Sequence, residues 1–221
     1  MNARLQWPKS IVRLADGGGD DGPETLSDEE QDNLIRFYED SLSIDLFSLI
    51  NSKTLYRFTY MLKSLQKLAR ELNTANKKDN PDGFEFSPSV RISSEGGDAF
   101  VGFSLFDLIR TSDVPVTTIA LGEVASSAMV AYLGGTKRRI YSNAFLMIHR
   151  SDPMDMNDLS RDQKDKRMAL IKLLDQRIVD IVLANSKLSK ERVRDLIIEE
   201  EYITARQAVK WGLAHEIITN K

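Results

Sequence analysis

Ser126 is the residue of this sequence whose type and position best suit nucleophilic chemistry. It lies in the segment Gly122-Glu-Val-Ala-Ser126-Ser127-Ala128, where an apolar, β-branched run gives way to a small-residue, helix-compatible one. A serine at such a junction is exposed at the carboxyl edge of a sheet, and the first N–H groups of the helix point at an oxyanion formed on its substrate. This arrangement suits acyl transfer. The alternative is that Ser126 is only a helix N-cap, a role that serine commonly fills.

Gly96-Gly97 and His149 can serve the same reaction. The glycine pair follows a strand-like run and precedes a helical one, so it can bring a bare backbone N–H against a substrate oxygen, although a plain tight turn explains it equally well. His149 directly follows the apolar run 144–148. An imidazole at that strand end can take the serine proton if a carboxylate fixes its tautomer, and Glu199-Glu200-Glu201 offers such carboxylates. The alternatives are a structural histidine and a solvated acidic face.

The composition excludes several other kinds of chemistry. The 221 residues include no cysteine, which excludes thiol nucleophiles, iron–sulfur clusters and disulfides. With only two histidines, His149 and His215, a multi-histidine metal site is not expected. A formal net charge of -3 gives no basic field for nucleic acid or an anionic membrane, so neither is expected as a partner. Without a signal-like or membrane-spanning apolar run, we expect a cytoplasmic protein.

Hydrophobic spacing predicts the elements that must position these residues. Short apolar runs at 89–93, 114–121 and 144–148 alternate with helical spacing at 100–109 and 126–133. This alternation of strands and helices predicts βαβ units around a parallel sheet, so the predicted fold class is α/β. Gly96-Gly97, Ser126 and His149 then each follow a predicted strand.

Two longer helices are also predicted. Within 34–72, apolar residues recur every three or four positions, which indicates an amphipathic helix, and the polar stretch 73–88 with Asn80-Pro81-Asp82-Gly83 indicates a loop. A second helix is predicted over 156–185. Its first half, 160–167, is polar on every side, and its second half carries an apolar stripe. We expect the polar half to project from the core or to contact another subunit.

Residues 1–33 are predicted to form a mobile acidic leader before a folded domain at 34–221. Eight carboxylates and no lysine or arginine lie between Asp16 and Asp32. Such a segment cannot bury enough apolar surface to offset its ordering entropy. A solubilising tail, a partner-binding arm and a pro-segment remain alternatives.

Taken together, these motifs resemble the ClpP family, the proteolytic subunit of the Clp ATP-dependent protease. The family's Ser-Pro-Gly-Gly signature, its Gly-x-Ala-Ala-Ser nucleophile segment, its strand ending in Met-Ile-His and its carboxyl-terminal acid, aromatic and Gly-Leu motifs all have counterparts in the same order. The counterparts are Ile92-Ser-Ser-Glu-Gly-Gly97, Gly122-Glu-Val-Ala-Ser126, Ser142-Asn143-Ala-Phe-Leu-Met147-Ile148-His149, Glu200-Glu-Tyr202-Ile-Thr204-Ala205 and Trp211-Gly212-Leu213. The resemblance covers residues 89–218.

The resemblance implies a ClpP/crotonase-like fold with a protruding handle helix and a serine endopeptidase that hydrolyses unfolded polypeptides through an acyl-enzyme on Ser126. It gives His149 the role of general base and Glu200 the position of the family's orienting aspartate. The backbone N–H groups of Gly97 and Ser127 match the oxyanion hole. The resemblance further implies homo-oligomeric heptameric rings that can pair into a tetradecamer. It implies no cofactor, because ATP is used only by a separate AAA+ unfoldase partner.

The sequence departs from the family pattern at several positions near the site. Glu200 is one methylene longer than the usual aspartate. Glu95 replaces the signature proline, which removes a fixed φ and adds a charge that either loosens the oxyanion loop or faces solvent. Ser127-Ala128 replaces methionine-glycine but keeps the N–H, and Arg150-Ser-Asp-Pro153 lacks the usual glycines.

Two other functions compete with an active peptidase. A catalytically silent ClpP-like subunit would shape or regulate a ring, but retention of Ser126, His149 and an acid in register favours catalysis. A crotonase-like protein would bind an acyl thioester through the same paired amides, but enolate chemistry would not require a serine–histidine pair. If Glu200 does not orient His149, Asp195 is the next candidate.

Overall fold

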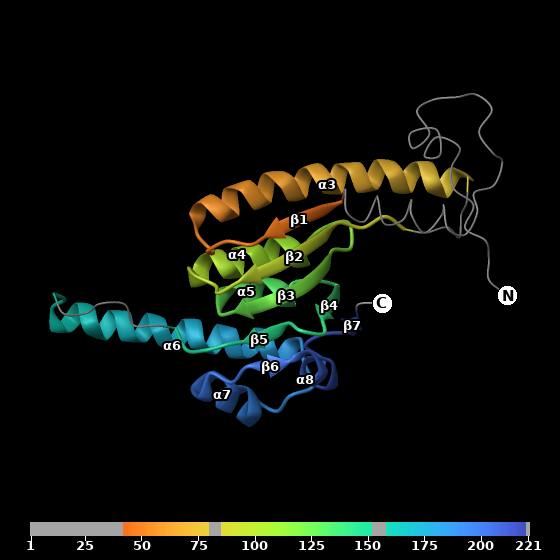
Figure 1. The fold of residues 1–221 in the computed structure, drawn as a ribbon. Coiled ribbons are helices and arrows are strands. Elements are labelled where there is room, and N and C mark those ends of the chain that lie inside the picture. The colour runs from red at the N-terminus through yellow and green to blue at the C-terminus, as the bar shows by residue number, and fades with distance from the viewer. Residues whose placement is uncertain (1–41, 80–84, 152–157, 220–221) are drawn as a thin grey trace.

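A mostly parallel sheet forms the centre of the computed structural model, which describes residues 42–79, 85–151 and 158–219 (Figure 1). The predicted leader 1–33, the turn 80–83 and the first residues of the predicted helix 156–185 lie outside this described part. The described elements in chain order are β1 (Ser43–Leu46), α3 (Ser52–Asp79), β2 (Ser89–Ser94), α4 (Ala99–Arg110), β3 (Thr117–Ala125), α5 (Ser127–Leu133), β4 (Lys137–Tyr141), β5 (Phe145–Met147), α6 (Arg161–Ala184), α7 (Lys190–Glu199), β6 (Ile203–Thr204), α8 (Ala205–Lys210) and β7 (Glu216–Ile218).

The sheet has the strand order β1-β2-β3-β4-β7, and β5 lies beside the carboxyl-terminal part of β3. Every pair along that order is parallel, as is the β3–β5 pair, whereas the short β6 runs antiparallel to β5. The α/β class with a parallel sheet is therefore confirmed. Because parallel neighbours end at the same edge, the carboxyl ends of β2, β3 and β5 come together.

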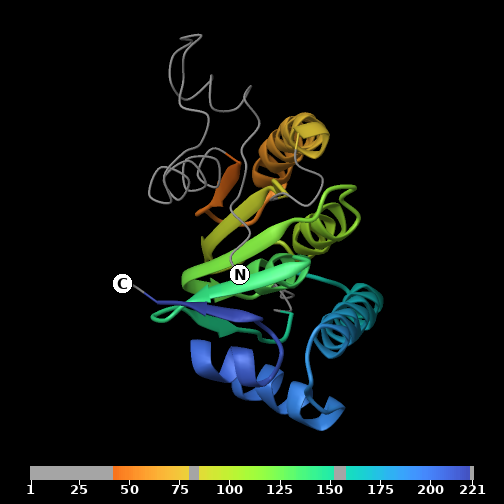
Figure 2. The ribbon, with the colours of Figure 1, turned by 90° about the vertical axis from the view of Figure 1, so that its right-hand side faces the viewer.

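Helices α3, α4 and α6 lie on one side of the sheet (Figure 2). Helix α5 connects β3 to β4 and is buried along its whole length. It packs closely on α4, where a Cβ built on Gly102 would be 2.7 Å from the Cβ of Ser127. Ser127 is thus fixed between the sheet and α4, which holds the start of α5 in place behind the carboxyl end of β3.

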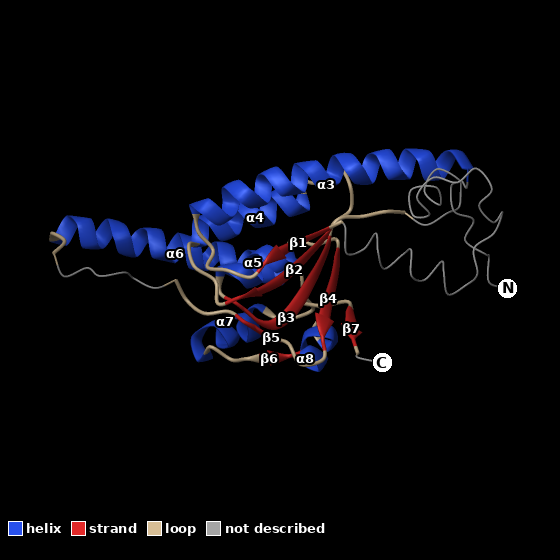
Figure 3. Cartoon of the chain, turned by 45° about the horizontal axis from the view of Figure 1, so that its top comes forward, coloured by secondary structure: helices blue, strands red, loops and turns tan. Residues whose placement is uncertain are grey.

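Helix α6 extends well beyond the edge of the sheet (Figures 1 and 3). It begins at a capping box formed by Ser160 and Gln163, and its first two turns are largely exposed. Its second half packs on the core through an apolar face: Ile171, Ile178, Val179, Ile181 and Val182. The prediction that the polar half projects from the core is confirmed. No helix in the described ranges is long and apolar enough to cross a bilayer.

Strand β3 does not end at Gly122, as the sequence predicted, but continues to Ala125. Its first half pairs with β4 and its last three residues pair with β5. Gly122 lies between these two parts with a φ of 54°, a conformation that glycine adopts without steric cost and that bends the strand. The bend lets β3 change partner, and it brings the residue before Ser126 beside β5.

Other errors lie in the amino-terminal half and at β4. Helix α3 starts at Ser52 rather than near residue 34 and continues to Asp79 through residues expected to form a loop. The side chain of Asn73 bonds the backbone N–H and carbonyl of Phe86 at 2.7 and 2.8 Å, which ties that end of the helix to the segment before β2. Strands β1 and β4 were not predicted, since local spacing does not reveal their partners.

Candidate active site

Ser126 occupies a sharp turn between β3 and α5. Its φ of 55° and ψ of −128° are unusual for a residue that carries a side chain. Its hydroxyl makes no capping hydrogen bond to α5, so the N-cap alternative does not explain the serine. A strained strand-to-helix turn of this kind presents a nucleophile at the top of a sheet.

The backbone of Ser126 is held against the strand that leads to His149. The Ser126 N–H donates to the carbonyl oxygen of Met147 at 2.9 Å, and Ala125 is the register partner of Met147. His149 follows two residues later and is half-buried. The predicted nucleophile and base therefore come from the ends of adjacent strands. No hydrogen bond joins Ser126 Oγ to the His149 ring in the described part of the chain.

Gly96 brings the end of β2 against the same serine. Gly96 is buried, and a Cβ built on it would lie 2.5 Å from the Cβ of Ser126 and 2.8 Å from the carbonyl oxygen of Ala125. Real side chains do not approach so closely, so the loop after β2 can reach Ser126 only with glycine at this position. The plain-turn alternative leaves this contact with the predicted nucleophile unexplained.

Gly97 presents its backbone N–H in the way that an oxyanion hole requires. On one side, the Ile50 N–H donates to the Gly96 carbonyl at 2.7 Å and the Asp98 N–H donates to the Ile50 carbonyl at 2.9 Å. In that pairing the Gly97 N–H is not used and points the other way, toward the side where β3 and Ser126 lie. The N–H of Ser127, the first amide of α5, likewise has no acceptor within its helix.

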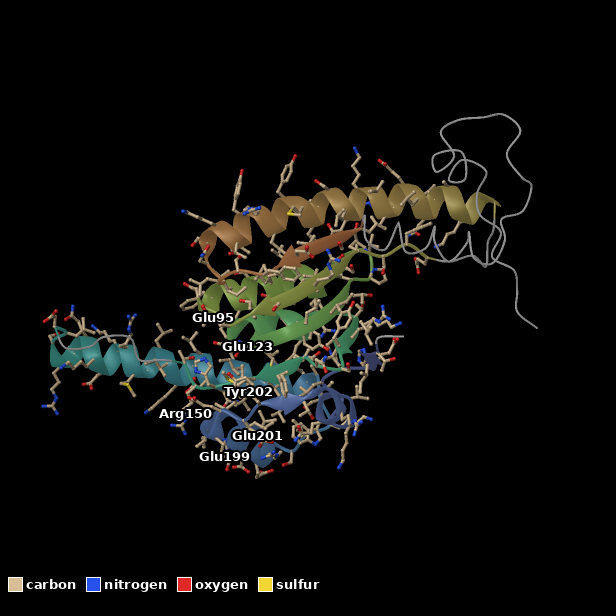
Figure 4. All side chains as sticks on the ribbon, in the orientation of Figure 1. Glu95, Glu123, Arg150, Glu199, Glu201 and Tyr202 are labelled. Carbon is tan, nitrogen blue, oxygen red and sulfur yellow. The ribbon has the colours of Figure 1, made fainter. Side chains whose placement is uncertain are left out.

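Glu95 faces solvent. Of the two alternatives for its charge, a loosened oxyanion loop or a solvent-facing side chain, the structure shows the second. Glu95 is exposed, and Figure 4 shows it on the edge of the sheet where β2 ends. The loop is held from inside by Ser94, whose hydroxyl donates to the Ser48 carbonyl at 2.8 Å and accepts the Gly96 N–H at 3.1 Å. Ser94 thus supplies the constraint that a proline ring would otherwise give.

Among the three acids 199–201, Glu200 is the one that has no salt bridge in the described part of the chain. It ends α7 in a left-handed conformation, with φ 51° and ψ 39°, and is exposed. Arg192 contacts both flanking acids, Glu201 at 2.6 Å and Glu199 at 3.9 Å. Within the described residues no hydrogen bond joins Glu200 to His149, and Asp195, the second candidate, is exposed on α7. The structure therefore brings Gly97, Ser126 and Ser127 together but does not link an acid to His149.

A pair next to the site was not recognised from the sequence. The Tyr202 hydroxyl donates to Glu123 at 2.8 Å, and the Tyr202 ring packs edge-on against Phe145 with centroids 6.4 Å apart. The hydrogen bond to Glu123 and its negative charge raise the pKa of Tyr202. Glu123 and Tyr202 lie at the same end of the sheet as Glu95 (Figure 4). Their contact depends on the pairing of β3, β5 and β6, which local spacing does not show.

His215 has a structural role away from this edge. The Arg138 N–H donates to its Nδ1 at 3.0 Å, and the Arg138 guanidinium donates to four backbone carbonyls. Partial burial and the charges of Arg138, Lys137 and Arg110 lower the pKa of His215. His149 is thus the histidine at the candidate site. No group of three His, Asp or Glu residues suited to a metal ion occurs in the described part.

Comparisons with known proteins agree with this architecture. The family model for Clp protease matches residues 82–221. The chain is 29% identical over 147 residues to the ATP-dependent Clp protease proteolytic subunit of Mesostigma viride, which covers 66% of this chain and 62% of that protein. It is also 29% identical over 140 residues to the proteolytic subunit 2 of Treponema denticola, covering 60% and 66%. The chain thus spans slightly less than two thirds of the length of these relatives.

Solved structures show the same fold. A point mutant of ClpP1 from Listeria monocytogenes matches with a TM-score of 0.66 and 20% identity, covering 85% of this chain and 97% of that one. ClpP1 itself from that organism matches with a TM-score of 0.60. The expected ClpP-like fold is therefore confirmed.

Proposed function

Because this chain belongs to the Clp protease family, we propose that it is a serine endopeptidase subunit of a self-compartmentalised ring protease. Its substrates are unfolded polypeptides, and the reaction proceeds through an acyl-enzyme on Ser126. The observation that carries the proposal is the conformation of Ser126, which has a positive φ, an uncapped hydroxyl and Gly96 packed against its side chain.

In the proposed reaction, each group at this edge of the sheet has its own role. Ser126 Oγ attacks the peptide carbonyl while His149 takes its proton, and the N–H groups of Gly97 and Ser127 bind the oxyanion. His149 then gives the proton to the leaving amine, and the amine departs. In deacylation His149 takes a proton from water as the water oxygen attacks the acyl carbonyl; the ester bond to Ser126 Oγ then breaks, the carboxylic acid leaves, and His149 returns the proton to Ser126 Oγ.

Glu200 is the group that orients His149 in this proposal. An imidazolium at the end of β5 needs a carboxylate on Nδ1 to hold its tautomer and to stabilise its charge. Arg192 contacts Glu199 and Glu201, so Glu200 is the acid of this group that Arg192 does not engage. Catalytic hydrogen bonds are often long before substrate binds and shorten in the complex. The Glu200–His149 contact forms at that stage.

The exposed handle helix supports a ring assembly. The exposed surface of α6 continues past the projecting half, residues 160–167, to Met168 and Leu173, which are 41% and 69% exposed. We infer that this half packs between opposed heptameric rings in a cytoplasmic tetradecamer, and that an AAA+ unfoldase delivers substrate. ATP is consumed by the unfoldase, and this chain uses no cofactor.

A catalytically silent ring subunit is the second candidate. It is favoured by a specific observation: in the described part of the chain, neither Ser126 nor Glu200 has a hydrogen bond to His149, and Glu200 is exposed. In that case the family fold would be kept for assembly alone.

Hydrolysis of an unfolded, fluorescently labelled polypeptide distinguishes the two. We expect the parent to release labelled fragments, and Ser126→Ala to lower the rate by at least about a thousandfold, because the acyl-enzyme cannot form. Ser142→Ala, an exposed serine outside the site, serves as the matched control and keeps the parent rate. A fully assembled parent that releases no fragments is the silent subunit.

A further inference from the structure

A positively charged cavity lies between α6 and α7, and the residue that follows His149 lines it. Its volume is about 320 Å³. Arg150, the residue directly after His149, lines it together with Lys172 of α6 and Arg194 of α7. Figure 4 shows Arg150 between α6 and α7. The cavity is therefore built from three segments, one of which continues the chain from β5 past His149, the base of the proposed mechanism.

None of these three cations has a salt bridge or side-chain hydrogen bond in the described ranges, and Glu191 interacts with Arg194 only electrostatically. This contrasts with Arg192 on the same α7, which is bound to Glu201 and stacks over Trp211 at 5.2 Å. Unpaired cations around one hollow raise the local potential for anions, because each adds to the same field.

The acidic lining residue does not neutralise that field. Asp175 of α6 lines the cavity, and its Oδ1 accepts the N–H of Ser151 at 2.8 Å. This bond fixes the backbone just after Arg150 to α6 and occupies one of the carboxylate oxygens. The lining as a whole carries three positive charges and one negative charge.

The rest of the lining is apolar. Val179 and Ile197 are 6% and 4% exposed and form a buried floor, whereas Ile198 is 56% exposed at the rim. A free inorganic anion gains nothing from such a floor. A carboxylate on an aliphatic stem suits both parts, since its methylenes can cover the apolar floor while its charge meets the cations.

We propose that this cavity is a substrate subsite that binds an aspartate or glutamate side chain close to the scissile bond. The proposal rests on the peptidase function above, because it takes the occupant to be part of the polypeptide whose amide bond lies between Ser126 and His149. It makes the ring protease selective for acidic segments of its substrates. The peptide's own terminal carboxylate offers the same chemistry, and the experiment separates the two sources.

Equilibrium binding to the full-length Ser126→Ala protein tests the subsite without requiring chemistry. Three labelled peptides share one apolar sequence: one has central glutamates and an amidated end, one has glutamines and an amidated end, and one has glutamines and a free carboxylate. By fluorescence anisotropy we expect the glutamate peptide to bind about five- to tenfold more tightly than the amidated glutamine peptide. This preference shrinks between about 50 mM and 500 mM salt.

Charge reversal in the Ser126→Ala background assigns the effect to the cavity. Arg194→Glu abolishes the preference for glutamate, whereas Arg177→Glu, which makes the same charge change at an exposed position of α6 outside the cavity, keeps it. Thermal unfolding of both variants checks that each is folded. Fluorophosphonate labelling of the parent reports on Ser126 independently, so failure of the peptidase proposal is distinguishable from failure of the subsite.

Several results overturn the subsite. The first is equal binding of the two amidated peptides, and the second is a preference for glutamate that survives Arg194→Glu. The third is a free-carboxylate peptide that binds as tightly as the glutamate peptide, which would assign the cavity to chain ends. Binding of the glutamate peptide only after removal of residues 1–33 would make the acidic segment of this chain the occupant, and the substrate proposal would be wrong.

Discussion

Gly96 lies so close to Ser126 that a Cβ built on it would be 2.5 Å from the serine Cβ and 3.1 Å from the serine Oγ. The loop that carries the Gly97 N–H and the turn that carries the nucleophile are therefore packed against each other. Neither can move without the other, because these distances leave no free space between them.

Gly96→Ala is expected to disable acylation through this contact. The methyl group must displace Ser126 or the loop, so the acylation rate falls by about 10²–10³-fold, the loss typical of one missing oxyanion donor. Gly212→Ala is the control, because Gly212 also has a positive φ, 77°, but the three atoms nearest to an added Cβ all belong to Lys187, at 3.2 Å or more. It lowers the melting temperature without slowing fluorophosphonate labelling. Labelling of Gly96→Ala at the parent rate would contradict the packing argument.

Glu200→Gln is expected to lower the acylation rate by about two to four orders of magnitude. The imidazolium of His149 loses its charged partner while the size of the side chain is kept. The matched control is Glu199→Gln, since Glu199 is an exposed neighbour on α7 whose carboxylate lies 3.9 Å from Arg192. Single-turnover acylation measures both. If Glu200→Gln acylates as fast as Glu199→Gln, another acid orients His149, and Asp195→Asn is measured next.

His215 makes stability fall as the pH drops below neutral. Its pKa is lowered in the folded protein, so below about pH 6.5 the unfolded chain takes up a proton that the folded chain resists. The neutral ring of His215 contributes fully to the free energy of unfolding above that pH. This contribution is lost as the pH falls toward the lowered pKa of His215 in the folded protein. Urea unfolding at pH 7.5 and pH 5.5 should show a larger loss of free energy in the parent than in His215→Asn. Equal losses would remove His215 as the cause.

Leu173→Glu is expected to break the assembly while leaving the subunit folded. Leu173 is 69% exposed on the outer face of α6, where an apolar side chain gains free energy only by contact with another subunit. A buried charge at such a contact costs several kcal/mol per interface, about 2–5 on typical scales. Light scattering should give a lower mass for Leu173→Glu and the parent mass for Arg177→Glu. An unchanged mass for both would place the subunit contact elsewhere.

The sequence predicted the parts of the fold that depend on local pattern. The strand before Gly96, the helix after Ser126 and the strand before His149 were all placed correctly, because each has an apolar run of the right period next to a glycine or a polar turn. Since such strands are parallel, their carboxyl ends meet at one edge, and the site follows from topology.

The errors concern long-range pairing. Strand β1 is held by β2, with Asp45 bound to Arg91 at 2.6 Å across 46 residues, and nothing within β1 itself indicates that partner. Strand β4 contains Arg138, which is buried because four backbone carbonyls accept its hydrogen bonds. A basic run normally indicates an exposed segment, so the strand was missed.

The candidate site could be predicted only in part, because its geometry also depends on long-range packing. The types of Ser126, His149 and Glu200 were visible in their motifs, but the positive φ of Ser126 and the close approach of Gly96 depend on how β2 and β3 pack. The contact of Arg192 with the acids on both sides of Glu200 is likewise a property of the folded turn.

The central claim is that Ser126 is an activated nucleophile. Intact-protein mass after exposure to a fluorophosphonate, beside Ser126→Ala and with the assembly state of each sample checked by light scattering, tests it most directly. We predict a single adduct on the assembled parent and none on the variant, because only a serine with a general base beside it attacks the reagent rapidly. A fully assembled parent without an adduct, or an equal adduct on Ser126→Ala, would contradict the account.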